Sequence, residues 1–370
     1  MRGRVPLARR ALFQDRRRAA LAAGGVAAAL LLVLLLQGIF DGAMRQATAY
    51  LRASPADVIV SQRDVRTMHM SVSALDPATD DAVRAVDGVA WAEGLRYTTT
   101  FLVGAGDRQQ LSYVIGYDTA TGRGGPRRLS AGRPPGPGEI LVERIAADRL
   151  GLRLGDRVGV FGGTFRVSGL FHGGTTIANS AAFIRTEDFA AGTPSAYVLV
   201  GARPGVPAGD LARRVAAAVP GDTVQTTGRF AREEAALVRD MSADLMRIMS
   251  TIGLLIALAV IALTLFTLTL AKLREHAVVK ALGGRTRRLA AVVLAEAAWS
   301  VALAVAVATA AAVVLGAVVG RVNPAVAVAV TPAGVVRVGL SALAVGAVGA
   351  IVPLRRVVAV DPASAFRRAS

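Results

Sequence analysis

Four long apolar runs separate the more polar stretches of this 370-residue sequence. They occupy residues 19–40, 246–271, 289–320 and 333–353. Each is long enough for a transmembrane helix, because about 20 predominantly apolar residues cross the hydrocarbon core of a bilayer. The third run exceeds this length, so we expect it to tilt, kink or extend beyond the membrane. The first run is too long for the apolar core of a secretory signal and shows no convincing cleavage site, which predicts an uncleaved anchor.

The stretch between the first two runs, residues 41–245, has the pattern of a water-soluble domain. Short β-branched segments and amphipathic segments alternate with Gly- and Pro-containing turns. Strands are predicted at 56–61, 89–102, 110–117, 139–142, 157–161, 164–171, 181–186, 196–201 and 222–227, and helices at 77–86, 143–150 and 209–219. This order gives two βαβ-like units around a β-rich insertion at about 119–193, and therefore predicts a layered α+β domain.

Two further features of this domain are predicted. The pair Gly162-Gly163 is expected to form the tight turn of a β-hairpin. A polar helix at 230–247 is expected to run directly into the second apolar run. Such a helix is a candidate mechanical link between the soluble domain and the membrane.

Composition and charge identify a membrane protein with a defined orientation. With 53% hydrophobic residues and a mean hydropathy of +0.49, the chain is too apolar for an ordinary soluble domain. The net charge of +17 is concentrated at 1–18, 272–288 and 355–370, beside the apolar runs, instead of on a nucleic-acid-binding surface. The positive-inside tendency places these segments in the cytoplasm, where anionic lipids attract them.

The predicted fold class is therefore an α-helical membrane protein with four transmembrane helices and an α+β extracytoplasmic domain inserted between helices 1 and 2. The cytoplasmic parts are the basic N-terminal segment 1–18, the loop 272–288 and the tail 354–370. Both termini are expected in the cytoplasm. We predict no nucleic-acid partner.

Few residue patterns point to chemistry within this chain. The absence of cysteine excludes disulfides, thiolate metal sites and cysteine catalysis. No G-x-x-x-x-G-K-[ST] motif is present, so any ATP hydrolysis must belong to another chain. We predict no catalytic residue and no cofactor of its own, with ATP bound by a partner subunit.

Two groups of residues were weighed as sites. Met68, His69 and Met70 carry soft ligand atoms suited to copper or haem iron, but three adjacent residues give poor geometry and no second cluster accompanies them. We therefore expect no metal site. A second group has residue types found in hydrolases without the spacing of a nucleophile elbow or triad, and is expected to be ordinary loop polar groups. Its members are His172, Asp148, Asp156 and Ser168.

The loop at 272–288 has a pattern of its own. Residues 274–282 place apolar residues on one side of a helix and charged residues on the other, and Gly283-Gly284 supplies the freedom that ends a helix. Such a helix suits a cytoplasmic partner, whereas the alternative is a solvated basic turn that only fixes topology. Glu296 lies inside the third run, where a carboxylate is costly. It either pairs with Arg287 or Arg288 or extends to the interface.

Small residues in the third and fourth runs permit close approach of helices. They fit packing within one chain as well as packing in a dimer. The glycines concerned are Gly316, Gly320, Gly339, Gly346 and Gly349.

Several of these segments resemble one known family. LREHAVVKALGG at 273–284, followed by an apolar helix with the early acidic Glu296, resembles the coupling region of FtsX-like permeases, the MacB-type class of ABC transporters. ADVIVSQ at 56–62 and EILVERIAADRLGLRLGD at 139–156 resemble their extracytoplasmic core domain, and the last 14 residues resemble their tail. The resemblance implies ATPase-coupling roles for Arg274, Glu275, His276, Val279, Lys280, Leu282 and Gly283.

The resemblance implies a non-catalytic permease subunit in the bacterial cytoplasmic or inner membrane. Its expected partners are an ABC-type ATPase subunit, a second permease copy and membrane lipids. Its expected activity is export or extraction of a substrate at the outer side of the membrane by mechanical transmission. Two alternatives stay open: a signalling subunit that activates an external cell-wall hydrolase without transport, and a membrane-anchored binding protein without an ATPase.

Overall fold

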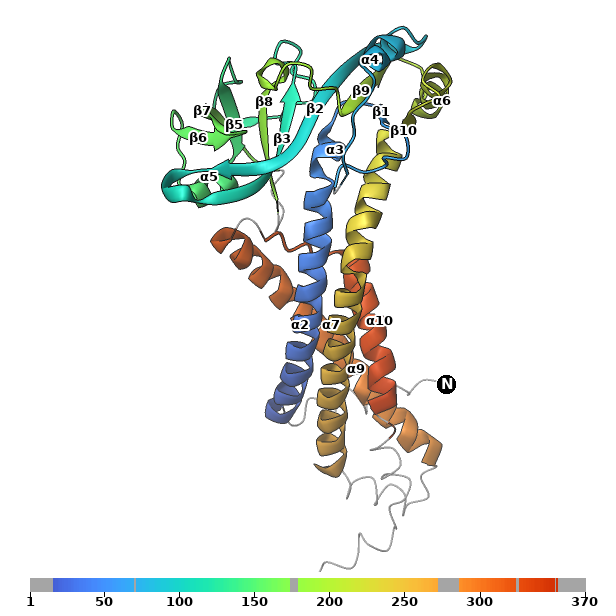
Figure 1. Cartoon of the computed structure of the whole chain (residues 1–370). Coiled ribbons are helices and arrows are strands. Elements are labelled where there is room, and N and C mark those ends of the chain that lie inside the picture. The colour runs from blue at the N-terminus through green and yellow to red at the C-terminus, as the bar shows by residue number, and fades with distance from the viewer. Residues whose placement is uncertain are drawn as a thin grey trace, which may run out of the picture. The chain divides into compact units, whose positions relative to one another are not determined.

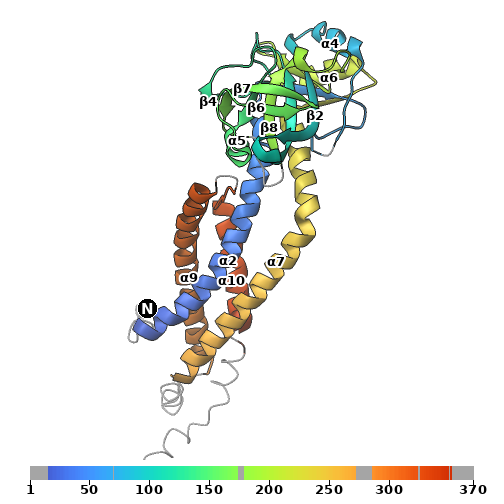
Figure 2. The ribbon, with the colours of Figure 1, turned by 60° about the vertical axis from the view of Figure 1, so that its left-hand side comes forward.

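The computed structural model describes residues 16–69, 71–173, 179–271, 286–323, 326–349 and 351. Its contacts divide the chain into two compact units. The α/β unit comprises Gly42–Ser242 and Asn323–Val326, and the helical unit comprises Met1–Asp41, Ala243–Val322 and Ala327–Ser370. Helices α2 (Arg16–Ala47) and α7 (Thr227–Ala271) contribute residues to both units. Figures 1 and 2 show the elements of each unit.

One half of the sheet in the α/β unit is built from two interleaved βαβ units. Its antiparallel strands lie in the order β10 (Thr223–Thr226), β1 (Val58–Ser61), β9 (Tyr197–Ala202) and β2 (Val89–Val103). Helix α4 (Pro77–Arg84) connects β1 to β2, and α6 (Ala208–Ala218) connects β9 to β10. In each connection one strand of the other unit lies in between, which is the split βαβ arrangement. The two predicted βαβ-like units are thus confirmed.

The other half of the sheet closes into a small barrel. From the outer part of β2 the order continues through β3 (Gln109–Tyr117), β8 (Ser180–Arg185), β5 (Glu139–Glu143), β7 (Gly163–Phe171) and β4 (Leu129–Gly132). Strand β6 (Arg157–Val160) pairs with β7 and, at Gly159, with Val103 at the end of β2, so the path returns to its start. The β-rich part therefore begins within β2, ahead of the expected start near residue 119.

Local sequence signals explain the ends of several elements. Helix α5 (Arg144–Leu150) begins where the Glu143 carboxylate accepts hydrogen bonds from Ile145 N at 2.7 Å and Ala146 N at 3.2 Å. It ends at Gly151, which adopts a left-handed conformation at φ 68°. Short 3₁₀ turns lie at Ala105–Asp107 and Thr186–Asp188.

The predicted hairpin turn is displaced by one residue. Strands β6 and β7 pair Val160 with Gly163, so the two turn residues are Phe161 and Gly162, with φ of 54° and 74°. The prediction of Gly162-Gly163 was therefore wrong. A two-residue hairpin turn of this kind needs positive φ at both central positions, and here a phenylalanine takes the first one.

Three hydrophobic clusters hold the α/β unit together. One lies between the split βαβ sheet and helices α4 and α6, and includes Val58, Val60, Val198, Val200, Leu211 and Val215. A second fills the barrel beside α5, and includes Ile140, Val142, Ala146, Leu150, Val158 and Ile184. The third extends over both halves of the sheet and reaches the start of α7, and includes Ile59, Leu95, Phe171, Phe183, Tyr197 and Phe230. Both halves of the sheet thus contribute side chains to a hydrophobic core.

The helical unit packs through small residues. It contains α9 (Thr286–Val322), α10 (Pro332–Gly349) and the described parts of α2 and α7 that belong to it. Ala304, Ala308 and Ala312, each four residues apart on α9, are fully buried in one cluster with residues of α2 and α10. Alanines at this spacing let helix backbones approach closely, which is the usual way helices associate in membranes.

Four of the five predicted glycines contact residues of the same chain. A Cβ added to Gly316 would lie 3.0 Å from Val328 Cγ1, and one added to Gly346 would lie 3.2 Å from Val301 Cγ2. Gly339 and Gly349 have neighbours within 4 Å in the same unit, whereas an added Cβ at Gly320 would meet none of the described atoms. These four glycines therefore support packing within the chain.

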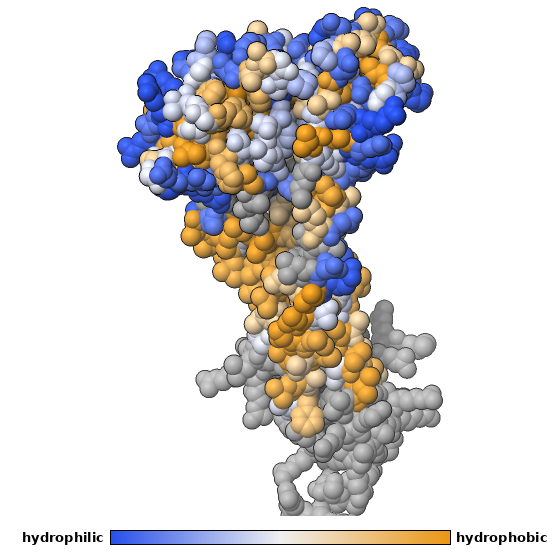
Figure 3. All heavy atoms as spheres, viewed as in Figure 1, coloured by the Kyte–Doolittle hydropathy of each residue, from blue (hydrophilic) through white to orange (hydrophobic). Residues whose placement is uncertain are grey.

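The surface of the helical unit is apolar. Large side chains such as Leu263, Val314 and Leu340 are more than 60% exposed, and apolar residues dominate the visible surface of this unit in Figure 3. Water would disfavour so extensive an apolar surface, whereas lipid would not. Three described helical segments are long and apolar enough to cross a membrane: Gly24–Gln46, Ala298–Val322 and Pro332–Gly349. The apolar stretch of α7, Arg247–Val260, is shorter, so the count of four spans stays a prediction.

Candidate functional site

Glu234 is a buried carboxylate at the start of α7. Only 4% of this residue is exposed. Its carboxylate accepts hydrogen bonds from the backbone N–H of Met68 at 2.7 Å and of His69 at 3.1 Å. Phe230, one turn earlier on α7, is fully buried in the core. The first turns of α7 are thereby fixed to the segment that follows β1.

Tyrosines from the sheet complete this contact. Tyr97 on β2 donates its hydroxyl hydrogen to the carbonyl of Met68 at 3.2 Å, and Tyr197 on β9 donates to the carbonyl of Thr67 at 3.2 Å. The rings of the two tyrosines meet edge to face with centroids 5.8 Å apart. We call Glu234, the 67–69 backbone and these tyrosines the Glu234 network. It joins α7 to two strands through groups that would otherwise be buried without partners.

His69 extends the Glu234 network toward the barrel. Asn179 Nδ2 donates to Tyr113 Oη at 2.6 Å, and Tyr113 Oη lies 2.6 Å from His69 Nδ1. The tautomer of the imidazole decides which of these two atoms, Tyr113 Oη or His69 Nδ1, donates the hydrogen bond. Burial lowers the pKa of His69 and raises the pKa of Tyr113. Both groups are therefore neutral near pH 7.

Burial dominates the ionisation of Glu234. It raises the pKa of this carboxyl above its ordinary value, and the N–H donors of Met68 and His69 oppose the shift. A cavity of about 50 Å³ lies beside the carboxyl and is lined by residues including Gln46, Tyr97 and Tyr113. This is room for one or two water molecules and not for a substrate.

A larger cleft of about 530 Å³ lies elsewhere in the α/β unit. It is lined by α3 (Ala49–Ala53), the loop 124–130, the end of β7 and part of β8. Its volume falls in the range of small-molecule sites. The cleft is therefore a candidate ligand site.

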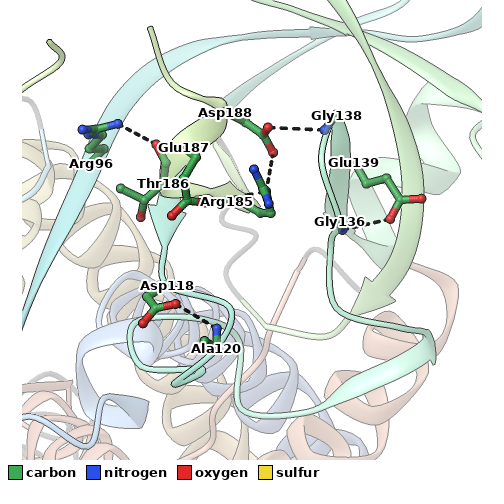
Figure 4. Close-up of polar contacts among 10 residues, drawn as sticks. All are labelled: Arg96, Asp118, Ala120, Gly136, Gly138, Glu139, Arg185, Thr186, Glu187 and Asp188. Atoms are coloured by element: carbon green, nitrogen blue, oxygen red, sulfur yellow. Dashed lines mark hydrogen bonds and ion pairs between the residues drawn. The ribbon is translucent and has the colours of Figure 1, made fainter. Parts of the chain in front are cut away.

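Other polar contacts in the barrel hold its loops in place. Figure 4 shows Arg96 donating to the carbonyl of Thr186 at 2.6 Å, and Asp188 accepting from the N–H of Gly138 at 3.3 Å and from Arg185 at 3.4 Å. The same view shows contacts from Gly136 N to Glu139 Oε2 at 2.9 Å and from Ala120 N to Asp118 Oδ1 at 2.8 Å. The hydrogen bond from the Gly136 N–H lowers the pKa of Glu139. Burial opposes this shift, and Arg133 adds to it.

Three of the four residues with side chains of hydrolase type have separate partners. Asp148 forms an ion pair with Arg144 on α5 at 3.4 Å. Asp156 accepts from the N–H of Arg153 at 2.8 Å within a turn. Ser168 donates to the carbonyl of Ile140 at 3.4 Å, whereas His172 lines the cleft. Asp148, Asp156 and Ser168 thus each have a local structural contact.

Other predicted site residues fall outside what the structure describes. These are Met70 and the seven coupling residues Arg274, Glu275, His276, Val279, Lys280, Leu282 and Gly283. Glu296 lies within α9, and its side chain is also outside the described part. No group of three or more His, Asp or Glu residues in the described ranges is arranged to hold a metal ion.

Sequence reasoning missed Glu234. The available signal was its spacing, since Glu234 follows the apolar Phe230 by four residues and precedes Val238 by four. An acidic residue on the apolar face of an amphipathic helix is a candidate for a buried, hydrogen-bonded carboxylate. The partners on the 67–69 segment could not be assigned from spacing, because more than 160 residues separate them from Glu234.

Comparison with known proteins identifies two family matches. Residues 19–218 match the MacB-like periplasmic core domain, and residues 247–362 match the FtsX-like permease C-terminal region. No curated protein matches the chain.

Solved structures similar to this chain include three domains of other membrane proteins. The periplasmic region of MacB from Actinobacillus actinomycetemcomitans is 10% identical, with a TM-score of 0.38, over 48% of this chain and 92% of that one. The extracellular domain of the ABC-type transporter YknZ from Gram-positive bacteria is 12% identical, with a TM-score of 0.36, over 46% and 98%. A domain of a permease protein from Porphyromonas gingivalis is 13% identical, with a TM-score of 0.33, over 46% and 86%.

Proposed function

Since the chain belongs to the family of FtsX-like, MacB-type permeases, the membrane subunits of ABC transporters, we propose that it transmits the conformational changes of a separate ATPase to its extracytoplasmic domain. The protein is a permease subunit of the bacterial cell membrane, with an external domain of the MacB-like type. In the proposed mechanism, ATP is bound and hydrolysed by the partner. The outcome at the outer side is export or extraction of a substrate.

The observation that carries this proposal is the continuity of α7. The helix runs without interruption from Thr227 to Ala271 and includes residues of both compact units. A hydrogen-bonded helix resists bending, and proline or glycine breaks that would kink it are absent from the stretch 229–252. The Glu234 network fastens the first turns of this helix to β2 and β9. A displacement of α7 is therefore transmitted directly to the sheet.

The proposed contact with the ATPase lies in the cytoplasmic loop. Arg274, Lys280 and their neighbours to Gly283 form the helix that the partner grips, and Glu296 pairs with the basic end of the loop. The four predicted spans, with both termini cytoplasmic, place this loop opposite the external domain. Two permease copies, each surrounded by lipid, change the separation of their external domains as the ATPase closes.

The partnership is tested by co-purification. The full chain is expressed with a candidate ABC-type ATPase from the same genome, and the Arg274→Glu/Lys280→Glu variant is expected to lose the ATPase from the purified complex. The matched control is Arg153→Glu/Arg213→Glu, which reverses two exposed charges of the α/β unit. Retention of the ATPase by the loop variant would show that the loop is only a topological signal.

The mechanical step is tested on α7. Asp240 is exposed on this helix, so Asp240→Pro is expected to kink it, whereas Asp240→Ala keeps it continuous. The chain has no cysteine, so a Val72→Cys variant accepts a single environment-sensitive dye at a residue that is 88% exposed. Addition of ATP to the complex should change the dye emission with Asp240→Ala and not with Asp240→Pro. An equal response in both variants would exclude transmission through α7.

Transport and hydrolase activation give different results in cells. For a transporter, deletion of the gene leads to accumulation of a substrate that the wild-type chain clears and Asp240→Pro does not. For an activator of a cell-wall hydrolase, no substrate accumulates and cell-wall cleavage falls instead. A membrane-anchored binding protein would purify without any ATPase.

A further inference from the structure

The cleft of about 530 Å³ in the α/β unit has no part in the transmission route described above. Its walls come from segments far apart in sequence: the region 49–55, the loop 124–130, residues 171–173 and β8. All of them belong to the α/β unit. The volume is about ten times that of the cavity beside Glu234 and is large enough for an organic ligand.

The walls of the cleft are held in place before any ligand binds. Tyr50 on α3 donates its hydroxyl hydrogen to the carbonyl of Gly124 at 2.9 Å, which ties one wall to the other. Gly125 packs on the ring of Tyr117, where an added Cβ would lie 2.5 Å from Cε2. Leu129 pairs with Phe171 in the β4–β7 ladder. Binding therefore requires little ordering of the loop, which favours affinity.

The floor of the cleft is aromatic and aliphatic. Phe171 and Phe183 meet with ring centroids 5.0 Å apart, and Tyr50 lies 6.0 Å from Phe183. Ala181 and Leu129 complete this surface. Phe171, Phe183 and Ala181 are at most 4% exposed and close the bottom of the cleft, whereas the half-buried Tyr50 and Leu129 present apolar surface that a hydrocarbon group can contact.

The mouth of the cleft is positively charged. Arg127 and Arg128 are exposed and line it, and none of the described lining residues is Asp or Glu. In the described part of the chain neither arginine forms an ion pair, whereas Arg213 and Arg214 on α6 pair with Asp210 at 2.8 Å and Asp87 at 3.3 Å. Guanidinium groups match the oxygen geometry of phosphate through paired hydrogen bonds.

We propose that this cleft binds an amphiphile whose phosphate headgroup carries a net negative charge, with its hydrocarbon part on Tyr50 and Leu129 and its phosphate at Arg127 and Arg128. Both features are needed, since the floor alone gives no headgroup preference and the arginines alone would bind any anion. The position of the cleft in the sequence agrees with a lipid-like ligand. Tyr50 follows Gln46, the end of the first candidate span, by four residues.

The test is hydrogen exchange, followed by mass spectrometry, on the full chain purified in a neutral detergent. The probe is dihexanoyl phosphatidylglycerol. Dihexanoyl phosphatidylcholine has the same hydrocarbon part with a neutral net charge, and inorganic phosphate has the anion without the hydrocarbon. The phosphatidylglycerol probe is expected to slow exchange in 49–55 and 124–130, and the other two are not.

Variants assign the effect to the cleft. Arg127→Gln/Arg128→Gln should weaken binding of the probe at least about fivefold, which corresponds to ~1 kcal/mol. Ala53→Phe, which fills the cleft from α3, should also remove the protection. The control Arg213→Gln/Arg214→Gln makes the same change of charge on α6 and should bind as the wild type does.

Each contrary result overturns the proposal. Equal protection by inorganic phosphate would show an anion site, equal protection by phosphatidylcholine would show no headgroup selection, and no protection would show no site. A role of the ligand as transported cargo rests on the proposed function. Binding itself needs no ATPase. A negative result in the exchange test therefore does not affect the conclusion from co-purification, and a negative co-purification does not affect the conclusion about the cleft.

Discussion

Glu234→Ala tests whether the Glu234 network holds α7 to the sheet. The substitution removes the acceptor for two backbone N–H groups, those of Met68 and His69. A donor left unpaired in the interior costs ~1–3 kcal/mol. Part of this is offset because the variant no longer buries a carboxylate, whose desolvation is unfavourable. We therefore expect the free energy of unfolding of the α/β unit to fall by ~2–4 kcal/mol.

The neighbouring residue provides a matched control. Glu233 forms an ion pair with Arg229 at 2.8 Å, and 27% of its side chain is exposed. Pairs of this kind contribute ~0–1 kcal/mol, so Glu233→Ala should change stability little. Both variants remove one acidic side chain from adjacent positions of the same helix. The comparison therefore separates loss of the network from loss of charge or helix propensity.

Thermal unfolding followed by tryptophan fluorescence provides the assay. The chain has two tryptophans, so a Trp299→Phe background leaves Trp91 on β2 as the only reporter of the α/β unit. For a unit of about 200 residues, each kcal/mol shifts the midpoint by ~2–4 °C, which gives a fall of roughly 5–15 °C for Glu234→Ala. A fall no larger than that of Glu233→Ala would refute the reasoning.

Three further predictions follow from the same structure. Because burial raises the pKa of Glu234, the folded state retains this proton better than the unfolded state, and the stability that the group contributes is lost as pH rises from 4.5 through the raised value. The midpoint difference between the wild type and Glu234→Gln should therefore shrink over that window, and a constant difference would contradict the assignment. Ala308→Leu overpacks a fully buried position of α9 and should cost ~1–3 kcal/mol, whereas Val314→Leu, at a position 63% exposed, should be neutral in detergent melting curves. Gly201→Ala places a Cβ on the indole ring opposite it in the sheet and should shift the tryptophan emission, whereas Gly209→Ala, in open space on α6, should leave it unchanged.

Local patterns predicted the fold well where one segment decides its own conformation. The strand at 56–61 and the helix at 143–150 correspond to β1 and α5, because a run of β-branched residues and a Glu143 cap followed by Gly151 act within a few residues. The closure of the barrel was not predictable in this way. It depends on a single pairing of Val103 with Gly159, whose strands are separated by more than fifty residues.

The same distinction between local and long-range features applies to the functional elements. The continuity of α7 was predicted because an unbroken polar helix leads into an apolar run in the sequence. The Glu234 network and the cleft were not, since each brings together residues that only the folded chain places side by side. Tyr50 and Gly124, for example, are 74 residues apart. The hydrophobic pattern predicts which face of a segment is buried. It does not predict which distant residue packs against that face.

The junction of β10 and α7 restricts where the backbone can bend. Thr226 ends the strand and Thr227 begins the helix, so no loop residue is available to absorb a change in direction. At this junction Thr227 donates its N–H to Asp57 O at 2.9 Å and its hydroxyl to Ala56 O at 2.7 Å. A twist of the helix would consequently shear the ladder of four residue pairs between β10 and β1. Amide protons of that edge strand should be the earliest to report such a twist.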